Sequence, residues 1–191
     1  MSKKYFSTCV CMLALSVGAC SSSQSDKGLP LAQRTFEHIN ARLVDVAVYD
    51  VLGDRAALSQ DVDKHFFLDP VEDLFGYFNH RLKPSGTDGE LYVVIRRVSV
   101  VYEEKETGNS AGAFFGIGKR DIYKISADVE LIKRGTSGKD QTMSFHAYRI
   151  VDIPEFSSVI DRERAQRSAL DKLIKDIDTA VITALDQTLR L

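Results

Sequence analysis

Three long segments with the residue pattern of β-strands, one rich in β-branched residues and two alternating between apolar and polar, restrict the fold of this chain more than any other feature. The clearest is IYKISADVELI, from Ile122 to Ile132, in which every second side chain is apolar. Successive side chains of a β-strand point to opposite faces, so this spacing predicts a strand with one face in the core and the other in water. The side chains predicted to face the core are Tyr123, Ile125, Ala127, Val129 and Leu131.

Further strands are predicted on both sides of this one. LYVVIRRVSVVYEE begins at Leu91, TMSFHAYRIV begins at Thr142, and the glycines of KRGTSGKD indicate a hairpin turn before the last of them. A shorter strand is predicted over LVDVAVYDV, from Leu43 to Val51, because its valines also alternate. The side chains expected to share its inner face are Val44, Val46 and Val48.

Two segments change to the 3.6-residue period of a helix. In LDPVEDLFGYFNHRL, Asp69 is placed to cap the first turn and Pro70 suits its first position. A longer helix is predicted from about Ser158 nearly to the end of the sequence. The apolar stripes are Val71, Leu74, Phe75, Phe78 and Leu82 in the first helix, and Leu170, Leu173, Ile174, Ile177, Val181, Ala184, Leu185 and Leu189 in the second.

The elements together predict an α+β fold with the order β-α-β-β-β-α. The first two strands are joined through a helix, which predicts a right-handed crossover. We expect a four-stranded mixed, mostly antiparallel sheet with both helices on one face. The other face of the sheet should be partly exposed to water.

Residues 1–19 have the order of a secretory signal: Lys3 and Lys4, a short apolar segment, and then small residues. The apolar segment is too short to be a comfortable membrane span, which needs roughly 20 apolar residues. It leads directly into Cys20, and Val17-Gly18-Ala19-Cys20 resembles the bacterial lipobox. This resemblance implies that a diacylglyceryl group is attached to the Cys20 thiol, that the signal is cut before it, and that the freed amine is acylated.

Such an anchor would hold the mature protein at a membrane, since two or three acyl chains suffice where one is marginal. The residue after the cysteine is Ser21 rather than an aspartate. By resemblance to the sorting rule of enteric bacteria, this favours the outer membrane over the inner membrane. Residues 20–35 are predicted to be a flexible tether and residues 36–191 a single domain. The alternative for the tether is an ordered arm that docks through Leu29 and Leu31.

Cysteine usage and charge exclude several classes of function. Cys9 and Cys11 lie in the signal, so the mature chain is left with Cys20, and thiol catalysis or a cysteine metal site is not expected. The chain has 25 basic and 27 acidic side chains, and removal of Lys3 and Lys4 with the signal leaves a formal net charge of −4. This mild acidity argues against binding to nucleic acid.

One glycine-rich segment, ETGNSAGAFFGIGKRD from Glu106 to Asp121, is a candidate contact site. Phe114, Phe115 and Ile117 make its tip apolar, as expected of a finger that enters a membrane or a groove of a partner. The alternative is that the phenylalanines fold back on the open end of the core. A phosphate-binding loop is excluded, because Arg120 stands where Ser or Thr is required and a strand follows.

Catalytic patterns are absent from the sequence. The histidines lie on separate predicted elements without HExxH-like spacing, and no GxSxG motif occurs. We therefore expect no enzyme, no cofactor and no metal. The histidines are His38, His65, His80 and His146.

The whole mature chain is similar in architecture to small envelope lipoproteins that assist larger machines. A lipobox, a short tether, a few strands, the lead-in VDIPEFSSVIDRERA and a terminal amphipathic helix resemble the lipopolysaccharide-assembly lipoprotein and the auxiliary lipoproteins of lipid-trafficking ABC transporters. The resemblance implies a non-enzymatic accessory or scaffold in outer-membrane assembly or transport, on the periplasmic side, within an envelope protein complex. The alternative is a carrier that holds a lipid or another apolar ligand between the sheet and the helices.

Overall fold

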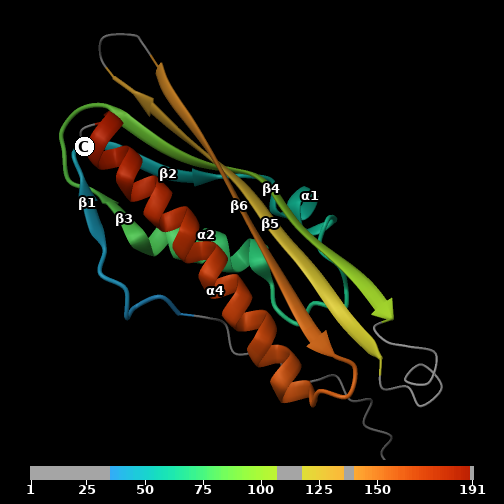
Figure 1. The fold of residues 1–191 in the computed structure, drawn as a ribbon. Coiled ribbons are helices and arrows are strands. Elements are labelled where there is room, and N and C mark those ends of the chain that lie inside the picture. The colour runs from blue at the N-terminus through green and yellow to red at the C-terminus, as the bar shows by residue number, and fades with distance from the viewer. Residues whose placement is uncertain (1–34, 107–117, 136–139, 190–191) are drawn as a thin grey trace, which may run out of the picture. The chain divides into compact units, whose positions relative to one another are not determined.

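A computed structural model describes residues 35–106, 118–135 and 140–189 of the chain (Figure 1). Long strands and one long helix dominate this part of the chain. In chain order the elements are β1 (Arg42–Val44), β2 (Val48–Leu52), α1 (Arg55–Ser59), α2 (Pro70–Arg81), β3 (Leu82–Pro84), β4 (Glu90–Glu106), β5 (Lys119–Arg134), β6 (Asp140–Pro154), α4 (Val159–Ala184) and a π-helical turn, η1 (Leu185–Leu189).

The main sheet has four strands in the order β2-β4-β5-β6. β2 runs parallel to β4, with Val48 opposite Glu90, and α2 lies in the connection between these two strands. β4, β5 and β6 are antiparallel neighbours. The predicted α+β class with a four-stranded, mostly antiparallel mixed sheet is confirmed. The structure adds the short helix α1 and a second sheet, in which β1 and β3 pair in parallel.

The prediction of one strand from Leu43 to Val51 is wrong, because the chain bends in the middle of this segment. Its first part, β1, pairs with β3, whereas its second part, β2, pairs with β4. Val44 and Val46 are buried, but Val48 is 44% exposed and Val51 takes the inward position. The alternation shifts because the two halves of the segment belong to different sheets.

A β-bulge keeps one side of β4 in the core along most of its length. The pairing of β4 with β5 shifts between Ile95 and Arg97. Before this shift the least exposed side chains stand at odd positions up to Ile95, and after it they stand at even positions such as Val98 and Val100. One extra residue, Arg96, therefore reverses the alternation in the sequence and leaves the inward face continuous.

Both predicted helices are confirmed, as is the predicted Asp69 cap, and the structure adds a cap at Ser158. The Asp69 side chain accepts hydrogen bonds from the first turn of α2, and Pro70 occupies the first position of that helix. The Ser158 hydroxyl accepts a hydrogen bond from the Asp161 N–H at 3.1 Å at the start of α4. Each cap satisfies backbone donors that a helix leaves free at its N-terminus. Figure 1 shows α2 and α4 on the same side of the sheet.

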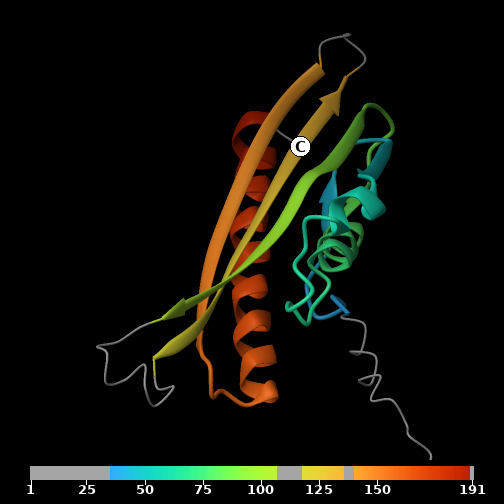
Figure 2. The ribbon, with the colours of Figure 1, turned by 90° about the vertical axis from the view of Figure 1, so that its right-hand side faces the viewer.

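The core lies between the sheet and these two helices. Leu173 and Ile177 of α4 are 0% and 1% exposed, and Leu74 and Phe78 of α2 are fully buried. Burial of each such side chain stabilises the fold by about 1.5–3 kcal/mol. α4 packs on β5 and β6, and α2 contacts β2 and β4 (Figure 2). The inward row predicted for β5 is buried throughout: Tyr123, Ile125, Ala127, Val129 and Leu131.

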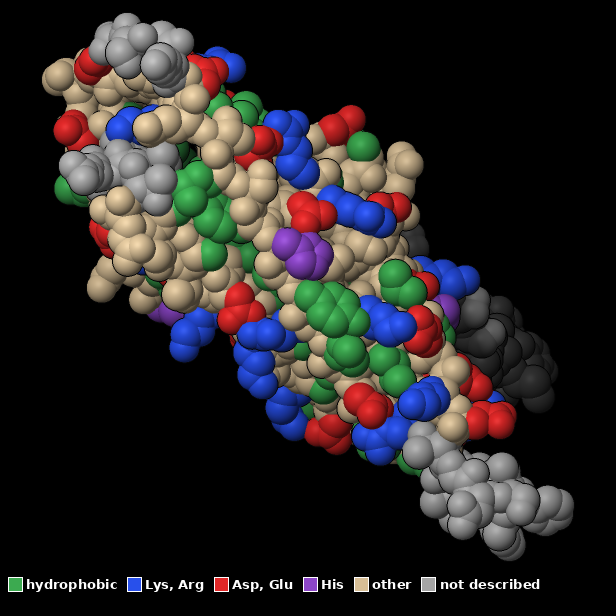
Figure 3. All heavy atoms as spheres, turned by 45° about the horizontal axis from the view of Figure 1, so that its top comes forward, with side chains coloured by type: hydrophobic (Ala, Val, Ile, Leu, Met, Phe, Trp, Pro, Cys, Tyr) green, Lys and Arg blue, Asp and Glu red, His purple; other side chains and the backbone are tan. Residues whose placement is uncertain are grey.

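The opposite side of β5 is partly exposed, as predicted. Lys124, Ser126, Asp128 and Glu130 are half-buried there. Lys124 and Glu130 form ion pairs with side chains of β4, and Asp128 contacts the His146 ring of β6. Such pairs across strands satisfy charges but contribute little to stability in water. Acidic and basic side chains are interspersed over the face seen in Figure 3, with small groups of hydrophobic side chains between them.

Candidate functional site

The site residues predicted from the sequence lie outside the described part of the chain. These are the lipid-attachment residue Cys20 and the candidate contact residues Phe114, Phe115 and Ile117. The predicted signal 1–19 lies outside it as well, as does nearly all of the predicted tether 20–35. These assignments stay predictions, and the site described below is built from other residues.

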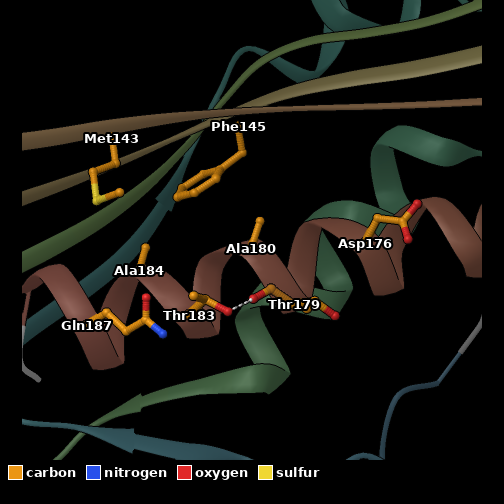
Figure 4. A pocket seen from close by; sticks show the side chains of 8 residues that line it. All are labelled: Met143, Phe145, Asp176, Thr179, Ala180, Thr183, Ala184 and Gln187. Carbon is orange, nitrogen blue, oxygen red and sulfur yellow. Dashed lines mark hydrogen bonds between the residues drawn. The ribbon is translucent and has the colours of Figure 1, made fainter.

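A groove of about 470 Å³ lies between β6 and the C-terminal half of α4 (Figure 4). Met143 and Phe145 stand on inward positions of β6 and point toward the helix, where Ala180 and Ala184 point back toward the strand. Both β6 side chains are only half-buried, because the groove is open to solvent. The lining residues are Met143, Phe145, Asp176, Thr179, Ala180, Thr183, Ala184 and Gln187.

The polar atoms of this groove are largely used within the protein. The Thr183 hydroxyl donates to the Thr179 carbonyl at 2.7 Å, and the Thr179 hydroxyl donates to the Lys175 carbonyl at 2.9 Å. Such bonds to the preceding helical turn leave the threonine methyl groups available for apolar contact. The groove can therefore accept an apolar group, and its lining offers no pairing of a nucleophile with a base.

An ion pair lies at the end of the groove away from Gln187. Arg149 of β6 pairs with Asp176 of α4, and both side chains are partly exposed. On the opposite side of the helix, Asp178 accepts a hydrogen bond from Arg81 Nε of α2 at 2.9 Å. The two aspartates thus fix α4 between the edge strand and α2, and Asp176 is already neutralised by its partner.

A second polar cluster lies where α4 begins. Arg162 of α4 pairs with the buried carboxylate of Asp121 on β5, and it also donates to the backbone carbonyls of Glu155 and Ser157. The Tyr102 hydroxyl of β4 donates to the same carboxylate at 2.8 Å. These bonds connect β4, β5, α4 and the turn after β6, so this cluster has a positioning role.

The pKa values in this cluster follow from the shared carboxylate. The hydrogen bond to Asp121, together with burial, raises the pKa of the Tyr102 hydroxyl to about 12. Desolvation acts to lower the pKa of the Arg162 guanidinium, but the hydrogen bond and the charge of Asp121 outweigh it and raise that pKa. Both groups therefore keep their protons at neutral pH, as a structural role requires.

Two buried polar residues, Asp121 of β5 and Gln166 of α4, were not predicted, although the strand and helix periods indicate their inward positions. Asp121 has the same parity as Tyr123 on β5, which assigns it to the inward face. Gln166 stands one helical turn before Leu170 on the apolar stripe of α4, and it is fully buried. Its amide accepts a hydrogen bond from the Phe67 N–H at 2.8 Å. The strand period and the helix period would have placed both residues correctly.

The histidines are not brought together by the fold. His38 is exposed on the segment before β1, and the other three lie at separate places. In the parts of the chain that the structure describes, no group of three or more His, Cys, Asp or Glu side chains could hold a metal ion. The ring nitrogens form hydrogen bonds between His65 and Asp63 at 2.8 Å, His80 and the Ile39 carbonyl at 2.6 Å, and His146 and Asp128 at 2.6 Å.

The helices of the described ranges are mostly short or amphipathic. None of the helices in these ranges is both long enough and apolar enough to cross a bilayer. α4 has the length, but charged residues such as Lys172 and Lys175 interrupt its sequence.

Comparison with known proteins found only remote likenesses. No protein-family model matches the sequence, and no curated protein matches it. A minor lipoprotein from Acinetobacter baumannii has a TM-score of 0.33 and 8% sequence identity, over 73% of this chain and 89% of that one. A Caulobacter crescentus CB15 protein classed provisionally as a lipoprotein has a TM-score of 0.30 and 12% identity, over 71% of this chain and 100% of that one.

Proposed function

We propose that this protein is a lipid-anchored envelope lipoprotein that acts as a non-enzymatic accessory or scaffold subunit in outer-membrane assembly or transport. Acylated Cys20 is the anchor in this proposal, and the domain faces the periplasm. The observation that carries it is the order of the N-terminal sequence, in which lysines, a short apolar segment and Val17-Gly18-Ala19-Cys20 follow one another. Ser21 at the next position supports the outer membrane over the inner one.

The described domain supports a scaffold over a carrier. A carrier needs an apolar cavity, whereas a scaffold needs a closed core and an exposed contact surface. Here, apolar side chains of α2 and α4 fill the space against the inward face of the sheet. Three hollows, beside Phe145, His146 and Tyr102, are open to solvent.

One feature, the apolar lining of the groove between β6 and α4, supports the second candidate function, a carrier for a lipid or another apolar ligand. Its lining presents Met143, Phe145 and the methyl groups of α4 to any molecule that enters. A volume of about 470 Å³ falls within the range of small-molecule sites. Its wide opening would leave much of such a ligand in contact with water, which disfavours tight retention.

The anchor is tested by replacing its nucleophile. Cys20→Ala should leave an uncleaved precursor and abolish labelling by a palmitate analogue, because the thiol that receives the lipid is gone. Cys11→Ala, in the predicted signal, is the matched control and should be processed and labelled normally. Labelling that persists in the Cys20→Ala protein would refute the lipoprotein assignment.

The scaffold and the carrier are distinguished by what accompanies the lipidated protein out of the membrane. After gentle solubilisation and capture, the scaffold hypothesis predicts specific envelope proteins in the preparation. Ala180→Phe narrows the groove, so it should reduce bound lipid if the protein is a carrier and leave the protein partners unchanged if it is a scaffold. Lys172→Phe, at an exposed position of the same helix, controls for an added aromatic side chain.

A further inference from the structure

Three large apolar side chains stand exposed around the turn that joins β6 to α4. Phe156 is 74% exposed, Val159 is 68% exposed and Ile160 is 67% exposed. These values are higher than those of any other large hydrophobic side chain in the described part of the chain except Leu43, which is 67% exposed on β1. We name the three residues Phe156, Val159 and Ile160 the apolar tip. Single exposed apolar side chains are ordinary, but a cluster on one turn indicates a contact surface.

The backbone of this turn is held firmly, so the exposure is not a consequence of loose structure. The Ser157 N–H donates to the Pro154 carbonyl at 3.0 Å, and the Glu155 N–H donates to the Lys119 carbonyl at 3.2 Å. The guanidinium of Arg162, which pairs with Asp121, donates hydrogen bonds to the carbonyls of Glu155 and Ser157. A buried ion pair therefore fixes the backbone of a turn whose apolar side chains are mostly exposed.

Several charged groups near the apolar tip pair with one another, but Glu155 Oε2, beside Phe156, is buried without a hydrogen-bond partner among the described residues. Arg164 pairs with Asp161 at 2.7 Å, and Arg120 pairs with Asp152 at 2.6 Å. Lys119 pairs with Glu104 at 2.7 Å. The cations near the tip are already paired, so this surface offers no excess of cations to attract an acidic partner. It is suited to an apolar partner that is reached without electrostatic steering.

The position of the anchor determines which apolar partner is within reach. Ser21 to Arg34 separate Cys20 from the described domain, and this length of chain spans at most about 50 Å when fully extended. A domain tethered at this distance contacts the lipid surface frequently. A protruding turn that bears Phe, Val and Ile matches the side chains by which peripheral proteins enter the boundary between headgroups and acyl chains.

We propose that the apolar tip is a second membrane contact, which inserts into the bilayer that holds the Cys20 anchor and thereby orients the domain on the membrane. This inference rests on the proposed lipid anchor. The inserted groups are the side chains of Phe156, Val159 and Ile160, and the ligand class is the acyl region of a phospholipid bilayer without a requirement for anionic headgroups. With the tip inserted, the C-terminal end of α4 and the groove beside Phe145 are kept away from the lipid.

The test measures the depth of one tip residue in a bilayer. Full-length lipidated protein carrying Ile160→Cys is labelled with an environment-sensitive fluorophore and reconstituted into vesicles of phosphatidylethanolamine and phosphatidylglycerol. The proposal predicts that emission shifts to shorter wavelength and is quenched by lipids with a nitroxide on the acyl chain. Lys172→Cys is the matched control, because it is exposed on the same helix about 18 Å along its axis. Its label should show neither shift nor quenching.

Further arms separate this proposal from its alternatives. Phe156→Ser with Val159→Ser, added to the Ile160→Cys protein, should abolish the shift and leave the melting temperature unchanged, since these side chains are exposed. A label at residue 160 that stays in water in lipid vesicles overturns the proposal, even if it is shielded in native membranes by a protein or in detergent by a second copy. The mass of the same preparation reports lipidation. A missing lipid refutes the proposed anchor, whereas a lipidated protein whose label stays in water refutes the apolar tip alone.

Discussion

The ion pair between Asp121 and Arg162 should be the most sensitive polar contact of the domain. The two side chains are 8% and 17% exposed, and they lie 41 residues apart in the sequence. Asp121→Leu leaves the Arg162 guanidinium without its carboxylate in a largely buried site. Removal of one partner from a buried pair costs about 3–5 kcal/mol, and the remaining exposure of Arg162 indicates a value near about 3 kcal/mol.

The loss should be visible as a shift in thermal unfolding. For a domain of this size, about 3 kcal/mol corresponds to a decrease of roughly 6–12 °C in melting temperature. Circular dichroism of the parent, the Asp121→Leu and Arg162→Leu variants and the double variant gives a double-mutant cycle. The double variant should be less destabilised than the sum of the two single variants, because neither charge is left buried alone.

A matched surface pair provides the control for this cycle. Arg164 and Asp161 pair at 2.7 Å with side chains that are 72% and 59% exposed. Arg164→Leu should therefore change stability by less than about 1 kcal/mol. If the Asp121 and Arg162 substitutions prove as mild as this control, and additive, the cluster does not hold the start of α4 and the argument is wrong.

Three further predictions concern other contacts. Leu173→Asp should cost several kcal/mol because it buries an unpaired charge, whereas Lys172→Asp, on the exposed side of α4, should be nearly neutral in the same melting experiment. Gln166→Leu removes the acceptor of a buried backbone N–H and should lower the free energy of unfolding by about 1–3 kcal/mol in urea denaturation. Tyr102 should ionise near pH 12 in an absorbance titration, and Asp121→Asn should bring its pKa closer to the ordinary value. The pKa of Tyr102 is higher in the folded state than the ordinary value of 10.0, so the protonated hydroxyl stabilises the fold. This contribution to the free energy of unfolding is complete below pH 10 and is lost as the pH rises toward about 12.

Elements with a strong local period were predicted correctly from the sequence. In β5 each side chain from Tyr123 to Leu131 faces the side that its position in the alternation assigns, because neighbouring residues of a strand must point to opposite faces. The stripe of α4 and the Asp69 cap of α2 follow in the same way from bonds and spacings within a few residues. No distant partner is needed to specify them.

Features that depend on a distant partner were decided by the tertiary structure alone. The bend between β1 and β2 exists because β3 and β4 accept different halves of one valine-rich segment. The extra residue Arg96 becomes a bulge only when β5 is paired with β4, and it then restores the inward face that the sequence alternation interrupts. In both cases the hydrogen bonds that determine the structure join residues far apart in the sequence, and a local period carries no information about such pairs.

The candidate sites divide along the same boundary. The lipobox ending in Cys20 is a contiguous motif, so the sequence by itself determined the proposal of a lipid anchor. The groove beside Phe145 requires β6 and α4 to lie next to each other, and the apolar tip is recognised only when Phe156 and Ile160 are seen to be exposed. An apolar residue has the same letter whether it fills a core or stands in water, and only the surrounding tertiary contacts distinguish the two.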